Sequence, residues 1–396
     1  MILKTWDRLN AWLPREGQFL IAAASIMMIP AWVKGINLLI LLALLVLAVC
    51  LVNYVVAWRQ TQHVTASRRW RGPVFAQAPS SWEINIHNNA PRSSTGLAIR
   101  DAGPQHECAW FVQHIPAQGT CTLRANVILP HRGHYRFHPV MIASASPFGL
   151  ARWTRAAGHA EEIVVLPALG RLRLERFRRW LQRITRGEHR LHRLARPSTI
   201  HQDDLHGLRP FRLGDNPRWI HWRTSARRNQ RMVREFEEDT GQNLILVFEP
   251  WQASPSADPS ALEAAISLAA TVVWEWSHFS SEYMMLAIAG PTPVVKGGFC
   301  SRDRALTMLR CLAEVVGTTT IETYPLIQAI AREPLVDAPI ILVSPRSDSP
   351  LAGALTAAWN RPFALLTFES SLDFYEPPTL TRRVGVPMSK GSPCPA

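Results

Sequence analysis

The sequence predicts a multidomain membrane protein in which an N-terminal transmembrane helical hairpin precedes an antiparallel β-sandwich and then a doubly wound α/β domain. Three observations indicate this order. Two apolar runs occupy the first 60 residues, short strand-like runs broken by turn residues fill about 60–165, and strands alternate with helical patterns from Asn243 onward. A chain of 396 residues is long enough for two or three domains.

The apolar runs at about 17–33 and 36–58 predict two transmembrane helices within the segment 1–59. A bilayer core of about 30 Å needs about 20 helical residues, so the second run is long enough to span it and the first is marginal. A cleaved signal peptide is the alternative for the first run, although the second span follows after only Lys34-Gly35. Basic residues flank the outer ends of the hairpin, at Lys4, Arg8 and Arg15 before it and at Arg59, Arg68, Arg69 and Arg71 after it. The positive-inside rule then places the soluble body in the cytoplasm.

The soluble part begins with a segment of strands, 60–168, and a basic segment, 169–200. Strands are expected at Trp82–His87, Leu97–Arg100, Cys108–His114, Cys121–Leu129, His134–Ala143 and Glu161–Leu166. The basic segment is a linker or an amphipathic helix, with Leu174, Phe177, Leu181 and Ile184 at helical spacing. Such a helix packs on its own domain by its apolar stripe, or it lies in the headgroup plane of the membrane.

The last part, 241–376, predicts an α/β domain with a parallel sheet. Strands are expected at Leu244–Phe248, Tyr283–Ala289, Ile340–Val343 and Phe363–Phe368, and helices at Ser260–His278, Ser301–Val316 and Leu351–Trp359. Ser260 is the expected N-cap of its helix. The tail 377–396 is rich in proline, glycine and basic residues and is expected to be disordered.

Between these parts, the segment 201–240 concentrates arginine around one Gly-Asp turn. Its arginines are Arg209, Arg212, Arg218, Arg223, Arg227, Arg228, Arg231 and Arg234. Gly214-Asp215-Asn216-Pro217 predicts a turn that starts a short helix over Arg218–Ala226, and a strand is expected over Gln230–Glu237. Helical spacing places His221 beside Ser225, and Arg218 near Trp222.

This segment resembles the signature of the domain of unknown function fifty-eight family, membrane-anchored proteins whose back half is similar to a von Willebrand A domain. The matching positions are Arg209, Phe211, Gly214, Asp215, Arg218, Ile220, His221, Trp222, Ser225, Ala226, Arg227 and Glu235. A second family-like piece comprises Arg132-Gly133-His134-Tyr135 and Ser146-Pro147-Phe148-Gly149-Leu150. The resemblance covers nearly the whole chain. It implies a multi-pass protein of a bacterial inner (plasma) membrane with a von Willebrand A-like domain over 241–376.

The resemblance implies a non-enzymatic scaffold or assembly factor without a cofactor. Its expected partners are membrane lipids through the hairpin, a MoxR-type AAA+ ATPase and other membrane proteins. The residues expected to set domain geometry or to form a docking face are Arg209, Arg212, Gly214, Asp215, Arg218, His221, Trp222, Ser225, Arg227 and Glu235. Two roles stay open for the arginines: an internal buttress paired with carboxylates such as Asp215 and Glu235, or a docking surface for an acidic partner.

A von Willebrand A-like domain implies a Mg²⁺ site that begins with Asp-x-Ser-x-Ser after the first strand, and this chain departs from that pattern. Glu249 stands at the aspartate, while Trp251 and Ala253 replace the two serines. Ser254 and Ser256 are nearby but out of register. Because a hard cation needs several oxygen ligands, the degenerate loop predicts no metal site.

Two other function classes remain open. A hydrolase or metal-dependent enzyme would use His221 with Ser225 and Asp215, the cluster His201, Asp203, Asp204 and His206, or the histidines His131, His134 and His138. No nucleophile elbow or complete ligand set accompanies these residues. The net charge of +13 also fits a basic lipid- or nucleic-acid-binding module. Nucleic acid is not an expected partner, because no nucleic-acid-binding fold is recognisable.

Overall fold

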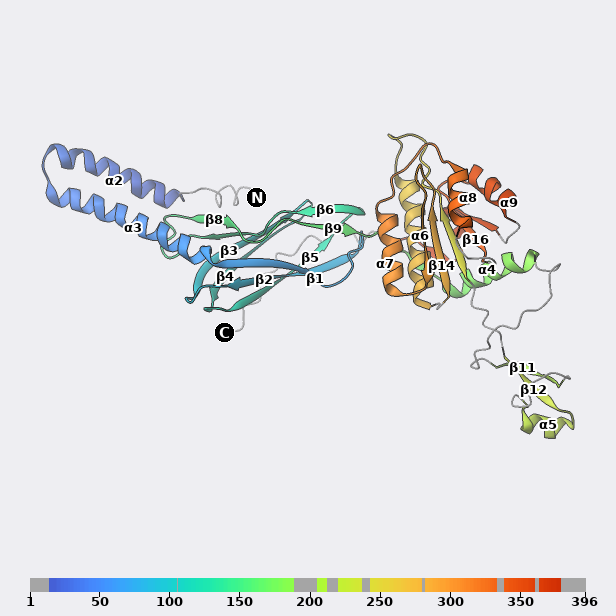
Figure 1. The fold of residues 1–396 in the computed structure, drawn as a ribbon. Coiled ribbons are helices and arrows are strands. Elements are labelled where there is room, and N and C mark those ends of the chain that lie inside the picture. Colours follow the sequence, from blue (N-terminus) through green and yellow to red (C-terminus); the bar gives the residue numbers. More distant parts are fainter. Residues whose placement is uncertain are drawn as a thin grey trace. The chain divides into compact units, whose positions relative to one another are not determined.

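The computed structural model describes residues 14–104, 106–188, 205–211, 220–236, 243–279, 282–332, 338–359 and 363–378 (Figure 1). The chain forms two compact units. The first contains two N-terminal helices and a β domain that ends at Gly170, and the second begins at Arg171 and contains an α/β sheet. The expected tail lies outside the described residues apart from Pro377 and Pro378.

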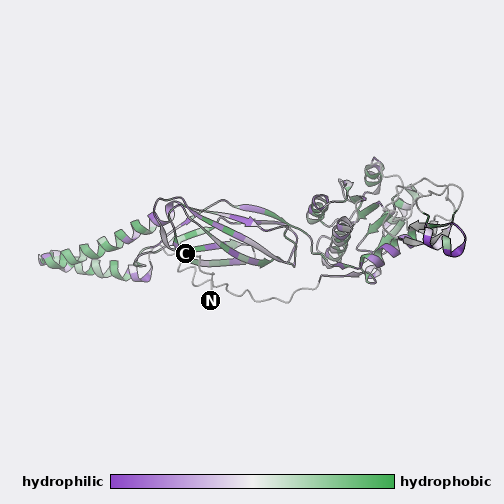
Figure 2. Cartoon of the chain, turned by 90° about the horizontal axis from the view of Figure 1, so that it is seen from below, coloured by the Kyte–Doolittle hydropathy of each residue, from purple (hydrophilic) through white to green (hydrophobic). Residues whose placement is uncertain are grey.

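The N-terminal helices are α2 (Arg15–Val33) and α3 (Asn37–Gln62), both long and apolar enough to cross a membrane. Gly35 lies in the turn between them with a φ of +58°, a left-handed conformation that glycine adopts without steric cost. Figure 2 shows hydrophobic residues along most of both helices. α3 continues to Gln62 rather than ending near Trp58, because its polar last turn packs on the β domain.

The β domain consists of antiparallel sheets that enclose one core. Its strands are β1 (Val64–Trp70), β2 (Pro79–Asn88), β3 (Ser94–Gly103), β4 (His106–Ile115), β5 (Thr120–Ile128), β6 (Gly133–Phe137), β7 (Met141–Ser144), β8 (Trp153–Ala156) and β9 (Glu161–Val165). The sheets have the orders β1-β2-β5, β4-β3-β7-β8 and β6-β9. Trp82 and Ile84 of β2 meet Leu97 and Ile99 of β3 in this core, so two sheets face each other as in a sandwich.

Two features of the β domain differ from the expectation. The strand expected over His134–Ala143 is two strands, because Pro139, which has no amide hydrogen, lies between β6 and β7. The chain changes partner there, since β6 pairs with β9 whereas β7 pairs with β3 and β8. Strands β1 and β8 were not expected. β1 alternates buried and exposed residues, but one of its buried residues is Arg68, so it lacks an apolar pattern.

Arg68 is held in the core of the β domain by several partners. Its guanidinium forms a buried ion pair with Asp101 and donates to the His138 carbonyl oxygen at 3.1 Å. The indole of Trp82 donates to the same Asp101 carboxylate at 2.9 Å. A buried charge requires such compensation, so this cluster joins β1, β2 and β3 around one carboxylate.

The second unit is built on a five-stranded sheet with the order β15-β14-β13-β16-β17. The strands are β13 (Leu244–Phe248), β14 (Tyr283–Ile288), β15 (Val294–Phe299), β16 (Ile340–Val343) and β17 (Phe363–Leu366). The helices are α6 (Ser260–Phe279), α7 (Arg302–Ala313), α8 (Thr323–Ala331), α9 (Pro350–Ala358) and α10 (Phe368–Ser371). All pairs are parallel except β14–β15, and β15 is an antiparallel edge strand that was not expected. Figure 1 shows α6 on one face of the sheet and α8 and α9 on the other.

The N-cap predicted for α6 differs by a small amount from the one in the structure. Ser260 is the first helical residue rather than the cap, and its amide and hydroxyl both donate to Asp258, at 3.0 and 2.9 Å. The carboxylate therefore satisfies a free N–H of the first turn.

The basic segment forms α4 (Leu174–Glu188), preceded by β10 (Arg171–Leu172), which pairs with β18 (Tyr375–Glu376). Phe177 and Leu181 are fully buried. The Phe177 ring lies 6.0 Å from that of Trp276 and 5.4 Å from that of Phe374. The apolar stripe of α4 is thus covered by its own unit, as expected of a surface helix rather than of one that lies in the headgroup plane.

Candidate functional site

The arginine-rich segment folds as a β-hairpin with a short helix inserted before its second strand. β11 (Leu205–Pro210) and β12 (Met232–Phe236) are antiparallel. Ile220 forms a bridge to Val233, and the His221 amide donates to the Met232 carbonyl oxygen at 2.8 Å. The chain is therefore extended at Ile220 and His221, which the sequence placed within a helix.

The helix, α5, spans Trp222–Arg228, which corrects the expected Arg218–Ala226. His221 is its N-cap, and the imidazole Nδ1 accepts from the Thr224 amide at 3.2 Å. Pairing of Ile220 with β12 prevents an earlier start, and the His221 side chain then satisfies a free amide of the first turn.

Ser225 fastens α5 to the start of β12. Its hydroxyl donates to the His221 carbonyl oxygen at 3.0 Å and accepts from the Met232 amide at 2.8 Å. Asn229 ends the helix in the left-handed region at a φ of +50°. The contact between Ser225 and His221 runs through the main chain rather than the imidazole, so this serine has a structural role and is not arranged as a nucleophile beside its base.

α5 exposes three arginines and one tryptophan to solvent. No residue of the helix is buried, and Trp222 is 69% exposed. Arg223, Arg227 and Arg228 are exposed on the helix, as is Arg231 in the turn after it. Among the described residues, no ion pair links these arginines to a carboxylate. An exposed indole beside several guanidinium groups is typical of residues that dominate protein interfaces.

The remaining predicted site residues are only partly described. Arg212, Gly214, Asp215 and Arg218 lie outside the described residues. Arg209 and Glu235 lie on β11 and β12, where Arg209 is opposite Val233 and Glu235 is opposite Gly207. The backbone register therefore does not place Arg209 directly opposite Glu235.

A second cluster lies at the carboxyl edge of the parallel sheet. Glu249 follows β13, and Ser344 and Arg346 follow the adjacent strand β16. The buried Glu249 carboxylate accepts from Ser344 Oγ and from Arg346 Nη2, both at 2.6 Å. The Arg346 guanidinium lies 4.7 Å from the centre of the Trp251 ring. This is the switch point of the sheet, where β13 separates β14 from β16 and where ligands of α/β proteins commonly bind.

The residues of this edge do not fit the Mg²⁺ site implied by a von Willebrand A-like domain. Glu249 is already neutralised by a guanidinium, and Trp251 and Ala253 supply no oxygen ligand. Ser254 and Ser256 contact each other at 3.3 Å. Across the described part of the chain, no group of three or more His, Cys, Asp or Glu side chains is placed to hold a metal ion, which includes His131, His134 and His138. Of the cluster at 201–206, the first four residues lie outside the described residues.

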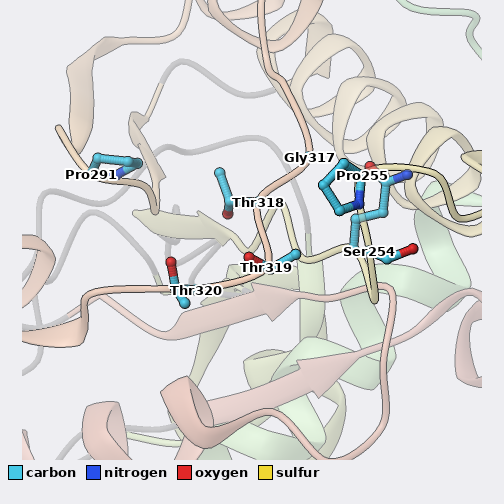
Figure 3. A pocket seen from close by; sticks show the side chains of 8 residues that line it. Ser254, Pro255, Pro291, Gly317, Thr318, Thr319 and Thr320 are labelled. Carbon is cyan, nitrogen blue, oxygen red and sulfur yellow. The ribbon is translucent and has the colours of Figure 1, made fainter.

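A shallow hollow of about 230 Å³ lies near this edge. It is lined by Gln252, Ser254, Pro255, Pro291, Gly317, Thr318, Thr319 and Thr320. Figure 3 shows Pro291 and the Ser254-Pro255 pair on opposite sides of the threonine run. The lining contains hydroxyl and amide groups but none of the predicted site residues and no charged side chain, so it offers hydrogen bonds without an acid–base group.

Sequence reasoning missed Ser344 and Arg346. The signal was present, because a polar Ser-Pro-Arg run directly follows the apolar strand β16. Adjacent parallel strands end at the same edge of a sheet, so this run was bound to meet the Glu249 loop. The strand order that makes β13 and β16 neighbours was the missing information.

Comparison with known proteins agrees with the signature found in the sequence. Residues 207–320 match the family described as "Protein of unknown function DUF58". The uncharacterized protein YeaD of Bacillus subtilis (strain 168) is 25% identical over 142 residues, which cover 36% of this chain and 33% of that protein. The match thus spans about a third of that relative.

Two solved structures of the CARDB domain of PF1109 from Pyrococcus furiosus are also similar, one of them a complex with di-metal ions. Their sequences are 10% and 12% identical to this chain, and the TM-score is 0.20 for both. Each match covers 26% of this chain, and the two matches cover 94% and 91% of the CARDB structures.

Proposed function

We propose that this chain, whose residues 207–320 belong to the DUF58 family, is a membrane-anchored, non-enzymatic scaffold that binds partner proteins through its cytoplasmic part. In this proposal α2 and α3 span the inner membrane of a bacterium, and the α/β unit is a von Willebrand A-like domain. The resemblance makes a MoxR-type AAA+ ATPase the first candidate partner.

One observation carries the proposal: α5 exposes Trp222 and its arginines while Ser225 and His221 hold it in one geometry. A docking element benefits from rigidity, because less conformational entropy is lost on binding. Guanidinium groups select a partner with carboxylates, and complementary charge raises the rate of encounter. The docking role is therefore favoured over the buttress role for the arginines of α5 itself.

The carboxyl edge of the sheet supports a role in binding rather than in metal chemistry. Glu249, the one carboxylate of the degenerate loop, is committed to Ser344 and Arg346. These two hydrogen bonds of Glu249 keep the loop after β13 in a fixed conformation next to the loop after β16. Such a fixed loop can display a surface without a bound cation.

Affinity purification of the full-length protein from its native host in mild detergent, with crosslinking and mass spectrometry, tests the proposal. We expect an AAA+ ATPase whose crosslinks map to residues on or beside α5. With the charge-reversed variant Arg223→Glu/Arg227→Glu, the amount of this partner that is recovered should fall at least tenfold.

A matched control is Arg124→Glu/Arg136→Glu, which makes the same change of charge at arginines of the β domain that are 71% and 72% exposed. It should retain the partner. Loss of the partner in both variants would indicate a general effect of net charge, and retention in both would remove α5 as the docking face. Recovery of the wild-type protein without any AAA+ ATPase would contradict the proposed partner.

A further inference from the structure

The loop between β7 and β8 packs along α3, and it contains an exposed phenylalanine. The loop includes the family-like run Ser146-Pro147-Phe148-Gly149-Leu150. Phe148 is 62% exposed, whereas the two strands that carry the loop pack on α3. Neither the sandwich core nor the arginine-rich segment uses this phenylalanine.

Asn53 of α3 binds this loop with both ends of its amide. Its Nδ2 donates to the Ala151 carbonyl oxygen at 2.8 Å, and its Oδ1 accepts from the Phe148 amide at 2.9 Å. Asn53 is fully buried although it lies in an otherwise apolar stretch of the helix. The amide therefore fixes Phe148 at the level of residue 53 along the helix axis.

The other contacts of the β7–β8 hairpin show which way it points. Its base lies at the end of α3, where Arg155 Nε donates to the Thr61 carbonyl oxygen at 2.7 Å and Ser144 Oγ donates to Gln60 Oε1 at 3.3 Å. Closer to its tip, the Trp153 ring lies 5.5 Å from that of Tyr54. The hairpin thus extends along α3 from residue 61 back toward residue 53.

This direction leads into the bilayer if α3 spans it as proposed above. Arg59 is the first charged residue after the apolar stretch of α3, and at a rise of about 1.5 Å per residue Asn53 lies about 9 Å deeper than Arg59. Tyr54, the residue after Asn53, and Trp153 lie at nearly the same depth as Asn53, where the interfacial aromatic side chains meet the acyl chains. Phe148, beside Asn53, reaches the level of the acyl chains.

The backbone of the loop is suited to that environment. Amide groups that leave water must be satisfied within the protein. The Phe148 amide donates to Asn53, the Gly149 amide to the Ala145 carbonyl oxygen at 2.8 Å, and the Ser146 amide to Ser144 Oγ at 3.3 Å. Pro147 has no amide hydrogen to satisfy.

Arg152, next to the loop, is partly buried and feels the charge of a residue of α2. Burial lowers the pKa of Arg152, while the opposite effect comes from Glu16 at the start of α2. Arg152, which follows the loop, is therefore within electrostatic range of the first turn of α2.

We propose that the Ser146–Leu150 loop inserts into the cytoplasmic leaflet, with Phe148 among the lipid acyl chains and Asn53 holding it there. This inference rests on the proposed membrane hairpin. It makes the β domain a body seated in the membrane surface rather than one tethered at a distance from it. The ligand is the interfacial region of a lipid bilayer.

Photo-crosslinking tests the insertion. The full chain is prepared with p-benzoylphenylalanine at position 148, in vesicles of phosphatidylethanolamine and phosphatidylglycerol, and lipid adducts are measured by mass spectrometry. Phe111→p-benzoylphenylalanine is the negative control, because Phe111 is 71% exposed on β4. Val52→p-benzoylphenylalanine is the positive control for the span itself, because Val52 is 54% exposed on α3.

We expect lipid adducts at positions 148 and 52 and none at 111. The insertion would be overturned, and the membrane hairpin retained, if lipid adducts formed at position 52 but not at position 148. Crosslinks from position 148 to protein instead of lipid would have the same meaning. Absence of adducts at both 52 and 148 would overturn the hairpin and the insertion together. Asn53→Leu should reduce the adduct at 148 severalfold and leave the adduct at 52 unchanged.

Discussion

The guanidinium of Arg346 neutralises the carboxylate of Glu249 at the carboxyl edge of the central sheet, with 2.6 Å between Nη2 and Oε1. The two residues follow strands that are far apart in sequence and adjacent in the sheet. The Glu249 side chain is fully buried and that of Arg346 is 19% exposed, so neither charge is well hydrated. The pair holds together the two loops that border the switch point of the sheet.

Arg346→Met should destabilise the protein markedly. Removing one partner of a buried ion pair leaves an uncompensated charge, at a cost of about 3 kcal/mol in the free energy of unfolding. Denaturant titration of the full-length protein in mild detergent measures this cost. The double variant Glu249→Gln/Arg346→Met should recover much of the loss, because no buried charge remains. Additive losses in the double variant would show that the two residues act independently.

Asp101→Asn should destabilise the β domain by a similar mechanism. The substitution removes the charge that compensates Arg68 in the core, and we expect a loss of about 3–5 kcal/mol. Glu83→Gln is the control, because Glu83 also pairs with arginines, but with Arg71 and Arg124, whose side chains are 50% and 71% exposed. Thermal unfolding followed by circular dichroism should show a clear shift for Asp101→Asn and almost none for Glu83→Gln. Equal shifts would contradict the role of burial.

Local sequence patterns were sufficient to predict the elements whose apolar residues are continuous or regularly spaced. β13 has the expected bounds, Leu244–Phe248, because all five of its residues are buried between two layers of helices. α3 was evident from an almost unbroken apolar run. The helical spacing of Phe177 and Leu181 likewise identified the buried stripe of α4.

Elements determined by distant partners could not be predicted in this way. β1 places Arg68 in the core, which is possible only because Asp101 lies opposite it in the fold. α5 starts at Trp222 because Ile220 is paired with Val233, and no local signal distinguishes that start from one at Arg218. At the candidate site, Glu249 and Trp251 already showed in the sequence that the expected Mg²⁺-binding pattern is not present. The partner of Glu249, Arg346, could not be predicted because it depends on the order of the strands.

Ser225→Ala should loosen the α5 hairpin without changing its charge. The hydroxyl accepts from the Met232 amide and donates to the His221 carbonyl oxygen. Its removal leaves the amide without a partner, which should lower the local stability of the hairpin by about 1–3 kcal/mol. Hydrogen exchange of the peptide spanning α5 and β12 should become faster. Arg227→Ala, at an exposed position of the same helix, is the control and should leave exchange unchanged. Unchanged exchange in Ser225→Ala would show that α5 is held by other contacts.

Cys108 provides a test of burial within the β domain through its pH dependence. Desolvation raises the pKa of its thiol from 9.0 to about 11, and the charges of Asp101 and Glu107 act in the same direction. At pH 8 the reactive thiolate is therefore about 100-fold scarcer than in an ordinary thiol, since each pKa unit is a factor of ten. We expect iodoacetamide to modify Cys108 far more slowly in the folded protein than in denaturant, with the rate still rising between pH 9 and 11.

The same shift affects stability with a definite sign. Because the folded protein holds this proton more tightly than the unfolded chain, the contribution of Cys108 to stability is present below pH 9 and is lost as the pH rises toward 11. Cys108→Ser should remove this part of the pH dependence of unfolding. Timed alkylation followed by peptide mass spectrometry, and unfolding of both proteins across this pH range, measure the two effects. Equal alkylation rates in folded and unfolded protein at pH 8 would contradict the burial of this thiol beside Asp101.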